Sequence, residues 1–350
     1  MTFAVAVSAS PPLVSAAGAR SELEGARRAA QFTELRASIA DNWGMSLSAL
    51  VKSATPVRAH MAAELPRPRL RLNAKLLVPA MARNLPLMGT AFDYLFRFGL
   101  ARRFPFAVSR QWVAESALKL VSQLADQDLV VLGHDYPGDY RPALQIKRRM
   151  AAIVADAKAR VASFVAGARL SDALIVSAIN LAHCDIYYRA GRLDERFGKP
   201  MRAQVSELRR LIQNVDWTRI SANRVCLLNP HFGDGSRFLG GADADALLDD
   251  LLLDVKTTGT LKIRTEDWRQ LLAYAALNMH FPIGGGKRRR RIRRIGFYFS
   301  RHGYLVSWLL SDVVDSEQFA KFAEWLRNYA EGLQAQRIAR KARANKRPVR

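Results

Sequence analysis

The sequence predicts an α/β (α+β) protein in which a block of helices precedes a β-sheet. Three observations support this class. Apolar residues recur at helical spacing through much of 88–215, strand-like apolar runs dominate from residue 222 onward, and a helical stretch at 264–281 interrupts those strands. With 350 residues, 49% of them hydrophobic and 24% charged, the chain can bury a sizeable core, as one large domain or two modest ones.

Residues 1–60 are predicted to form a flexible, partly helical N-terminal extension. Residues 1–30 are rich in Ala and Ser, whereas apolar positions within 21–43 recur at helical spacing. The apolar start has no Lys or Arg before it and so does not match an export signal. The prolines and basic residues of 64–86 then indicate a linker or a surface loop.

A first core helix is predicted over 88–105. Thr90 can cap its start, and Pro105 ends it. Asp93 and Arg97, four residues apart, share one side of this helix. Its apolar side comprises Phe92, Leu95, Phe96 and Phe98.

Residues 106–215 are predicted to form a large helical insert. The stretch at 133–142, which reads GHDYPGDYRP, breaks its first two helices. The helices are expected at about 109–126, 141–168, 171–190 and 200–214.

The strands of the sheet are predicted in the C-terminal part of the chain. They are expected within 224–230, 244–248, 251–258, 294–301 and 304–310. The Gly-rich stretch 231–241 is predicted to be a connection, and Thr265 to be the N-cap of the helix at 264–281. Residues 311–350 are expected to form a last helix that ends in a basic tail.

The charge of the chain favours a polyanionic partner. Lys and Arg number 54 against 31 Asp and Glu, for a formal net charge of +23 and a pI near 10.7. Nucleic acid is the leading candidate, although an anionic membrane surface or plain solubility would fit the same charge. No apolar run approaches the length needed to span a bilayer, and we expect no membrane partner.

The cysteine content predicts a reducing compartment. The chain has two cysteines, Cys184 and Cys226, too few and too far apart for a disulfide framework or a zinc cluster. They are expected to be reduced, buried thiols, and the protein is expected to be cytoplasmic.

Asp residues are concentrated in 240–258, against the trend of a basic chain. Asp249 and Asp250 form a polar pair between two apolar runs, which predicts an antiparallel hairpin that turns at these two residues. The cross-strand pairs expected in this register are Leu248 with Leu251, Leu247 with Leu252, Asp245 with Asp254, and Asp243 with Lys256. Because side chains alternate along a strand, the charged members of these pairs project from one face, and the other face can be buried.

The opposed carboxylates predict a metal site. Two of them about 5 Å apart repel by roughly 3 kcal/mol at an effective dielectric of about 20, so the fold needs a compensating cation. Oxygens of Asp245 and Asp254, the carbonyl of Val255 and waters would form a shell suited to Mg²⁺ or Mn²⁺. Lys256 would orient or activate the water that attacks a phosphodiester. The alternative is a solvated Asp-rich hairpin without a chemical role.

These residues resemble a known family. Asp245, a short hairpin and the DVK of 254–256 look like the pattern of the PD-(D/E)XK nuclease superfamily. The sequence continues as KTT, as in the RecB-like branch, and Gln270 and Tyr274 match the Gln-x-x-x-Tyr motif of that branch. The GTAFD of 89–93 is similar to the first-helix motif.

The resemblance implies a central mixed β-sheet flanked by helices, with a restriction-endonuclease-like core over 61–310 that carries the helical insert. It also implies that Asp93 assists the metal site. The helix with Gln270 and Tyr274 would pack beside the active strands and contact the substrate or steady Lys256, although Tyr274 also fits a core-packing role. A bulge in the hairpin would bring Asp243 to the metal in place of Asp245.

A dense cation run follows the Gly-rich segment at 284–286. Residues 281–350 hold 17 Lys or Arg against 5 Asp or Glu, so about half of the excess charge lies in the last fifth of the chain. We expect these cations to hold a nucleic-acid backbone without reading its sequence. The predicted contacts are Lys287, Arg288, Arg289, Arg290, Arg291, Arg293 and Arg294, with Arg237 from the connection before the hairpin.

Together these features predict a metal-dependent nuclease that hydrolyses phosphodiester bonds, DNA being the expected substrate. The alternative is a non-catalytic nucleic-acid-binding or assembly protein on the same fold, and a membrane-surface protein is a third reading. A protein partner is not predicted by any feature of the sequence.

Overall fold

The computed structural model describes residues 46–65, 71–133, 139–284 and 289–345. The predicted helix at 21–43 lies outside the described residues. The helices are α2 (Leu47–Ser53), α3 (Thr55–Glu64), α4 (Leu85–Arg103), α5 (Val113–Ser122), α6 (Ala143–Val165), α7 (Asp172–Ala190), α8 (Arg202–Gln213), η1 (Trp217–Arg219), α9 (Asp234–Phe238), α10 (Thr265–His280), η2 (Ser300–His302), α11 (Leu310–Val313) and α12 (Ser316–Asn345). The strands are β1 (Val108–Ser109), β2 (Leu129–Leu132), β3 (Asp139–Pro142), β4 (Cys226–Leu228), β5 (Ala246–Leu248), β6 (Leu251–Lys256), β7 (Arg294–Phe299) and β8 (Tyr304–Leu309).

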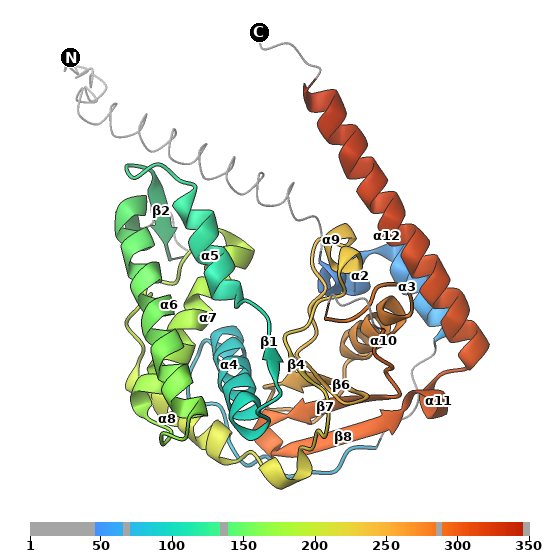
Figure 1. Cartoon of the computed structure of the whole chain (residues 1–350), viewed down its shortest axis with the longest axis horizontal. Coiled ribbons are helices and arrows are strands. Elements are labelled where there is room, and N and C mark those ends of the chain that lie inside the picture. Colours follow the sequence, from blue (N-terminus) through green and yellow to red (C-terminus); the bar gives the residue numbers. More distant parts are fainter. Residues whose placement is uncertain (1–45, 66–70, 134–138, 285–288, 346–350) are drawn as a thin grey trace, which may run out of the picture. The chain divides into compact units, whose positions relative to one another are not determined.

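A mixed sheet forms the centre of the described part of the chain. Its six strands follow the order β1-β4-β5-β6-β7-β8, and β4, β5 and β6 are successively antiparallel. Strand β7 pairs parallel to β6, which requires a crossover, and α10 provides it. The expected α+β class and the mixed sheet flanked by helices are confirmed (Figure 1).

Both faces of the central strands β4 to β7 are largely buried, each against a different set of helices (Figure 1). Leu248, Leu251 and Leu253 pack in a core with α4 to α8, whereas Leu247 and Leu252 pack in a second core with α2, α3, α10 and α12. This alternation is the period of two of a pleated strand, and the paired residues of the hairpin, Ala246–Leu248 and Leu251–Leu253, are all apolar because both of their faces are buried.

The predicted hairpin forms in the predicted register. Leu248 pairs with Leu251, Leu247 with Leu252 and Ala246 with Leu253. Asp249 begins the two-residue turn at a φ of 51°, which few non-glycine residues other than Asn and Asp adopt easily. Its carboxylate accepts the N–H groups of Asn223, Arg224 and Val225, which fixes the turn against the chain before β4.

The helices of the predicted insert are present as α5 to α8. The expected break at 133–142 is in part a strand: β2 and β3 pair as a separate antiparallel ribbon, with residues 134–138 outside the described part. The apolar run Leu129–Leu132 lies between the helices expected at 109–126 and 141–168 and was not predicted as a strand.

Three local predictions were wrong. The first core helix begins at Leu85 and is capped by Asn84, whose side chain accepts the N–H of Leu87, so Thr90 lies inside the helix. The connection at 231–241 contains the short helix α9. Helix α10 has Arg264 as its N-cap, and Thr265 is its first helical residue.

A fully buried ion pair ties the sheet to the loop before α4. Arg301, in η2 at the turn between β7 and β8, lies 2.5 Å from Glu207 of α8. The other oxygen of Glu207 accepts the N–H groups of Met81 and Ala82 at 2.6 and 2.7 Å. Arg301 also donates to the carbonyl of Thr257, directly after β6, and so supports the end of this strand.

Helices α2 and α3 fall largely in the segment expected to be an N-terminal extension. Leu47, Leu50, Val51, Val57 and Met61 of these helices are buried in the core with α10 and α12. Among the described helices, none has the length and apolar character that crossing a membrane requires.

Candidate active site

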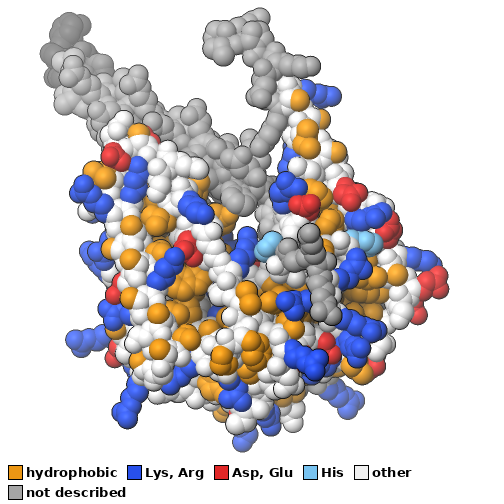
Figure 2. All heavy atoms as spheres, viewed as in Figure 1, with side chains coloured by type: hydrophobic (Ala, Val, Ile, Leu, Met, Phe, Trp, Pro, Cys, Tyr) orange, Lys and Arg blue, Asp and Glu red, His pale blue; other side chains and the backbone are white. Residues whose placement is uncertain are grey.

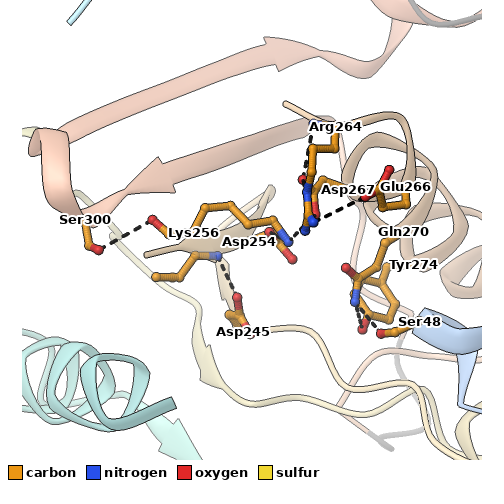
Figure 3. A network of polar contacts seen from close by, with 11 residues as sticks. Ser48, Asp245, Asp254, Lys256, Arg264, Glu266, Asp267, Gln270, Tyr274 and Ser300 are labelled. Atoms are coloured by element: carbon orange, nitrogen blue, oxygen red, sulfur yellow. Dashed lines mark hydrogen bonds and ion pairs between the residues drawn. The ribbon is translucent and has the colours of Figure 1, made fainter. Parts of the chain in front are cut away.

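Acidic and polar side chains gather where β6 ends, beside the start of β5 and the first turns of α10 (Figure 3). Strand β6 supplies Asp254 and Lys256 on the face toward α10, and the residue before β5 is Asp245. Helix α10 supplies Asp267, with Gln270 one turn later. The crossover that makes β7 parallel to β6 therefore brings the start of α10 to the C-terminal end of β6.

Asp245 and Asp254 lie close together, although β5 itself begins one residue after Asp245. The N–H of Val255 donates to Oδ2 of Asp245 at 2.6 Å. Burial raises the pKa of Asp245 well above its usual range, and the charges of Asp93 and Asp254 raise it further. The β5–β6 ladder ends at the pair of Ala246 with Leu253, so Asp245 does not pair with Asp254 through the backbone but contacts the next residue, Val255.

Lys256 is held between two carboxylates. Its Nζ lies 2.9 Å from Oδ2 of Asp254 and 3.0 Å from Oδ1 of Asp267. Burial alone would lower the pKa of Lys256, but Asp254 and Asp267 outweigh this effect, and the pKa is raised. The two carboxylates therefore stabilise the charged form of Lys256.

Asp267 is in turn held by Arg264. The guanidinium donates to both oxygens of Asp267, at 2.9 and 3.1 Å. Burial would raise the pKa of Asp267, but the hydrogen bonds from Arg264 and the charge of Lys256 lower it. A chain of alternating charge thus runs from Arg264 at the surface through Asp267 and Lys256 to Asp254 (Figure 3).

Asp93 reaches the same region from α4, on the other side of the sheet. Its Oδ2 pairs with Arg97 at 2.6 Å, as the four-residue spacing suggested. Its Oδ1 is buried and accepts no hydrogen bond from the described residues. Oδ2 of Asp254 likewise accepts no hydrogen bond of good geometry there, although Lys256 lies near it.

The buried Oδ1 of Asp93, which has no hydrogen-bond partner among the described residues, and the nearby carboxylates of Asp245 and Asp254 are oxygen donors of the kind that a hard cation prefers. Within the described residues, no group of three or more His, Cys, Asp or Glu side chains is arranged to enclose a metal ion. Mg²⁺ does not require such a cage, since it retains several waters and commonly uses one or two carboxylates. Asp245 and Asp254 would hold it, with Asp93 adjacent.

Asp243, the other candidate for the first metal ligand, lies apart from this cluster. Its carboxylate pairs with Arg110 at 2.5 Å, and its backbone forms an isolated bridge with His231. The predicted pairing of Asp243 with Lys256 is not found, because β5 starts only at Ala246 and Lys256 turns to Asp254 and Asp267.

Gln270 and Tyr274 are neighbours on α10, as their spacing implies. Nε2 of Gln270 donates to the hydroxyl of Tyr274 at 3.0 Å and to Oγ of Ser48, on α2, at 2.5 Å. Tyr274 is buried and stacks on Phe232, with ring centroids 5.4 Å apart. Burial raises its pKa, and the charges of Asp245 and Asp254 raise it further, so its hydroxyl lies near the carboxylates.

The predicted basic contacts are distributed unevenly. Lys287 and Arg288 lie outside the described residues. Arg294 forms an ion pair with Asp250 at 2.9 Å, and Arg237 of α9 forms one with Asp234 at 2.9 Å. The exposed members of the run are Arg289, Arg290, Arg291 and Arg293. Lys and Arg side chains are spread widely over the face drawn in Figure 2.

Three residues of this site were not singled out by the sequence. Asp267 was visible only as an acidic residue in the first turn of a helix, and Arg264 as a basic residue before it. Ser48 stands 222 positions from Gln270 and belongs to no motif. No local pattern connects residues that distant.

The chain matches no protein-family model, no curated protein and no solved structure.

Proposed function

We propose that the protein is a metal-dependent nuclease that hydrolyses phosphodiester bonds, with DNA as its substrate and Mg²⁺ or Mn²⁺ as its cofactor. One observation carries this proposal: the carboxylate of Asp245 accepts the N–H of Val255, which places it beside Asp254 in a buried site. Burial raises the pKa of Asp245, and the charges of Asp93 and Asp254 raise it further. A divalent cation shared by these carboxylates would relieve their repulsion. The resemblance of these residues to the PD-(D/E)XK pattern supports the same reading, and with it we propose a restriction-endonuclease-like core.

In this proposal Asp245 and Asp254 hold the cation. A bound divalent ion would lower the pKa of a water and neutralise charge on the phosphate. Lys256, which remains protonated, donates to the attacking water or to a phosphate oxygen and does not take up a proton. Asp267 keeps Lys256 in place, and Arg264 keeps Asp267 in place.

The exposed Arg289, Arg290, Arg291 and Arg293 would contact the nucleic-acid backbone without reading its sequence. Lys287 and Arg288 extend the same run in the sequence. A cytoplasmic location remains a prediction. Both cysteines are free and buried, which agrees with the expected reduced thiols.

A non-catalytic nucleic-acid-binding role is the second candidate, and one observation favours it. Lys256 lies within ion-pair distance of both Asp254 and Asp267, and Arg97 pairs with Asp93, so part of the negative charge is compensated without a metal. A protein that only binds would therefore keep a stable site with no cation present.

An assay of DNA cleavage distinguishes the nuclease function from the non-catalytic binding role. We expect purified protein to cleave DNA with Mg²⁺ or Mn²⁺, and Asp254→Ala and Lys256→Ala each to abolish cleavage while circular dichroism shows retained folding. A wild-type protein that leaves linear, circular and single-stranded DNA and RNA intact with either metal, yet binds DNA, would favour the non-catalytic role.

A further inference from the structure

Ser48 contributes a hydroxyl to the candidate site from a helix outside the motifs. Helix α2 is anchored next to the hairpin: the N–H of Leu47 donates to the carbonyl of Gly241 at 2.8 Å, and Leu47 and Leu50 are buried. Ser46 caps the helix by accepting the N–H of Ala49. Ser48 is therefore held on a short, well-fixed element.

The Nε2 atom of Gln270 donates hydrogen bonds to two acceptors. Nε2 carries two hydrogens, and its two partners are Oγ of Ser48 at 2.5 Å and the hydroxyl of Tyr274 at 3.0 Å. An amide that donates on one side must present its oxygen on the other. In Figure 3 the oxygen of Gln270 lies on the side that faces Asp254.

This orientation determines what the side chain can bind. An amide oxygen accepts hydrogen bonds and cannot donate them, whereas a phosphate oxygen needs a donor. A group that binds the Gln270 oxygen beside Asp254 must therefore donate a hydrogen bond from an O–H or N–H. At a site of phosphodiester hydrolysis, the attacking water is such a donor.

We propose that Ser48 is a positioning residue that holds the Gln270 amide with its oxygen toward Asp254, where this oxygen accepts a hydrogen bond from the attacking water. The inference rests on the proposed nuclease function. Without Ser48, Tyr274 alone restrains the amide, which can then rotate and present its nitrogen. The attacking water would lose one of the groups that orient it.

The test compares three variants of the full chain. Ser48→Ala removes the hydroxyl, Ser48→Thr keeps it, and Ser53→Ala is the matched control on the same helix, since the hydroxyl of Ser53 donates to the carbonyl of Ala49 and is exposed. We expect Ser48→Ala to lower kcat for Mn²⁺-dependent DNA cleavage by roughly 10- to 100-fold, the range seen for residues that orient a reactive group, with KM little changed. Ser48→Thr should recover most of kcat. Equal loss in Ser48→Ala and Ser48→Thr, or none in either, overturns the proposal.

A second measurement needs no activity. In protein labelled with ¹⁵N-glutamine, the Gln270 amide signals, assigned by their loss in Gln270→Glu, should shift and exchange faster in Ser48→Ala but not in Ser53→Ala. Unchanged signals in Ser48→Ala overturn the positioning role even if the enzyme cleaves DNA. A wild-type protein without cleavage refutes the nuclease function and the role at the water, while these signals still report whether Ser48 holds the amide.

Discussion

Asp267 is the residue that joins the surface of the site to its interior. It accepts from Arg264 and lies 3.0 Å from Lys256, so one buried carboxylate compensates two cations. Lys256 can remain charged although it is largely buried because two carboxylates, Asp254 and Asp267, stabilise its ammonium group. With Asp254 alone, the attraction of a single ion pair would have to offset the desolvation of both groups.

Replacing Asp267 should therefore reduce stability in a pH-dependent manner. We expect Asp267→Asn to lower the free energy of unfolding at pH 7 by about 1–3 kcal/mol, since Lys256 loses a partner. The pKa of Asp267 is lowered by folding, so its contribution is complete above the unfolded value of about 3.9 and is lost as the pH falls through the folded value. Urea unfolding at pH 7 and pH 3 should show the variant and the wild type converging at the lower pH. A constant difference would contradict this account.

The hairpin shows at the scale of elements how a few polar residues define a register. Asp249 adopts a positive φ, and its carboxylate accepts hydrogen bonds from three backbone N–H groups. Its backbone conformation and its side chain therefore both fix the position of the turn. Asp250, beside it, pairs with partly exposed Arg294. The two acidic residues look alike in the sequence but have different partners.

Replacing Asp249 and replacing Asp250 should therefore reduce the free energy of unfolding by different amounts. Asp249→Ala removes the acceptor of three N–H groups, of which that of Val225 is partly buried, and places Ala at a positive φ, so it should destabilise the protein by about 1–3 kcal/mol. Asp250→Ala removes one partly exposed ion pair and should cost about 0–1 kcal/mol. Thermal unfolding of both variants, followed by circular dichroism, tests this order, and a larger loss for Asp250→Ala would refute the role assigned to Asp249.

Much of the fold and part of the site could be predicted where the signals are local. The hairpin register followed from a polar pair between apolar runs, and the pairing of Asp93 with Arg97 followed from helical spacing. The contact of Ser48 with Gln270 and the pair of Glu207 with Arg301 could not be predicted, because they join residues 222 and 94 positions apart. Tertiary packing decides such contacts, and no periodicity in the sequence encodes them.

At the scale of the whole molecule, the buried pair of Glu207 and Arg301 connects the helices on one side of the sheet to the end of β6. Removing one partner of a buried pair leaves an uncompensated charge, which costs about 3–5 kcal/mol. We expect Glu207→Gln to lower the free energy of unfolding by about this amount in urea denaturation. The double variant Glu207→Gln with Arg301→Met should recover part of the loss. No recovery would indicate that Arg301 stabilises the fold mainly through its bonds to Val78 and Thr257.

The basic surface gives a second prediction at this scale. For duplex DNA, each Arg that no longer neutralises a phosphate should reduce the slope of log affinity against log salt by about 0.9. Replacing Arg289, Arg290 and Arg291 by Ala should therefore flatten the slope, measured by fluorescence anisotropy. Arg160→Ala is the control, because this exposed Arg pairs with Asp156 on the helical side. Equal slopes in the triple variant and the wild type would exclude this segment from the interface.

The central claim is that one divalent cation is shared by Asp245 and Asp254, and calorimetric titration with Mn²⁺ tests it most directly. We expect saturable binding to the wild-type protein, its loss in Asp245→Asn and Asp254→Asn, and its retention in Asp243→Asn, whose carboxylate pairs with Arg110 instead. Absence of saturable binding to the wild type, or equal binding by all four proteins, would contradict the claim.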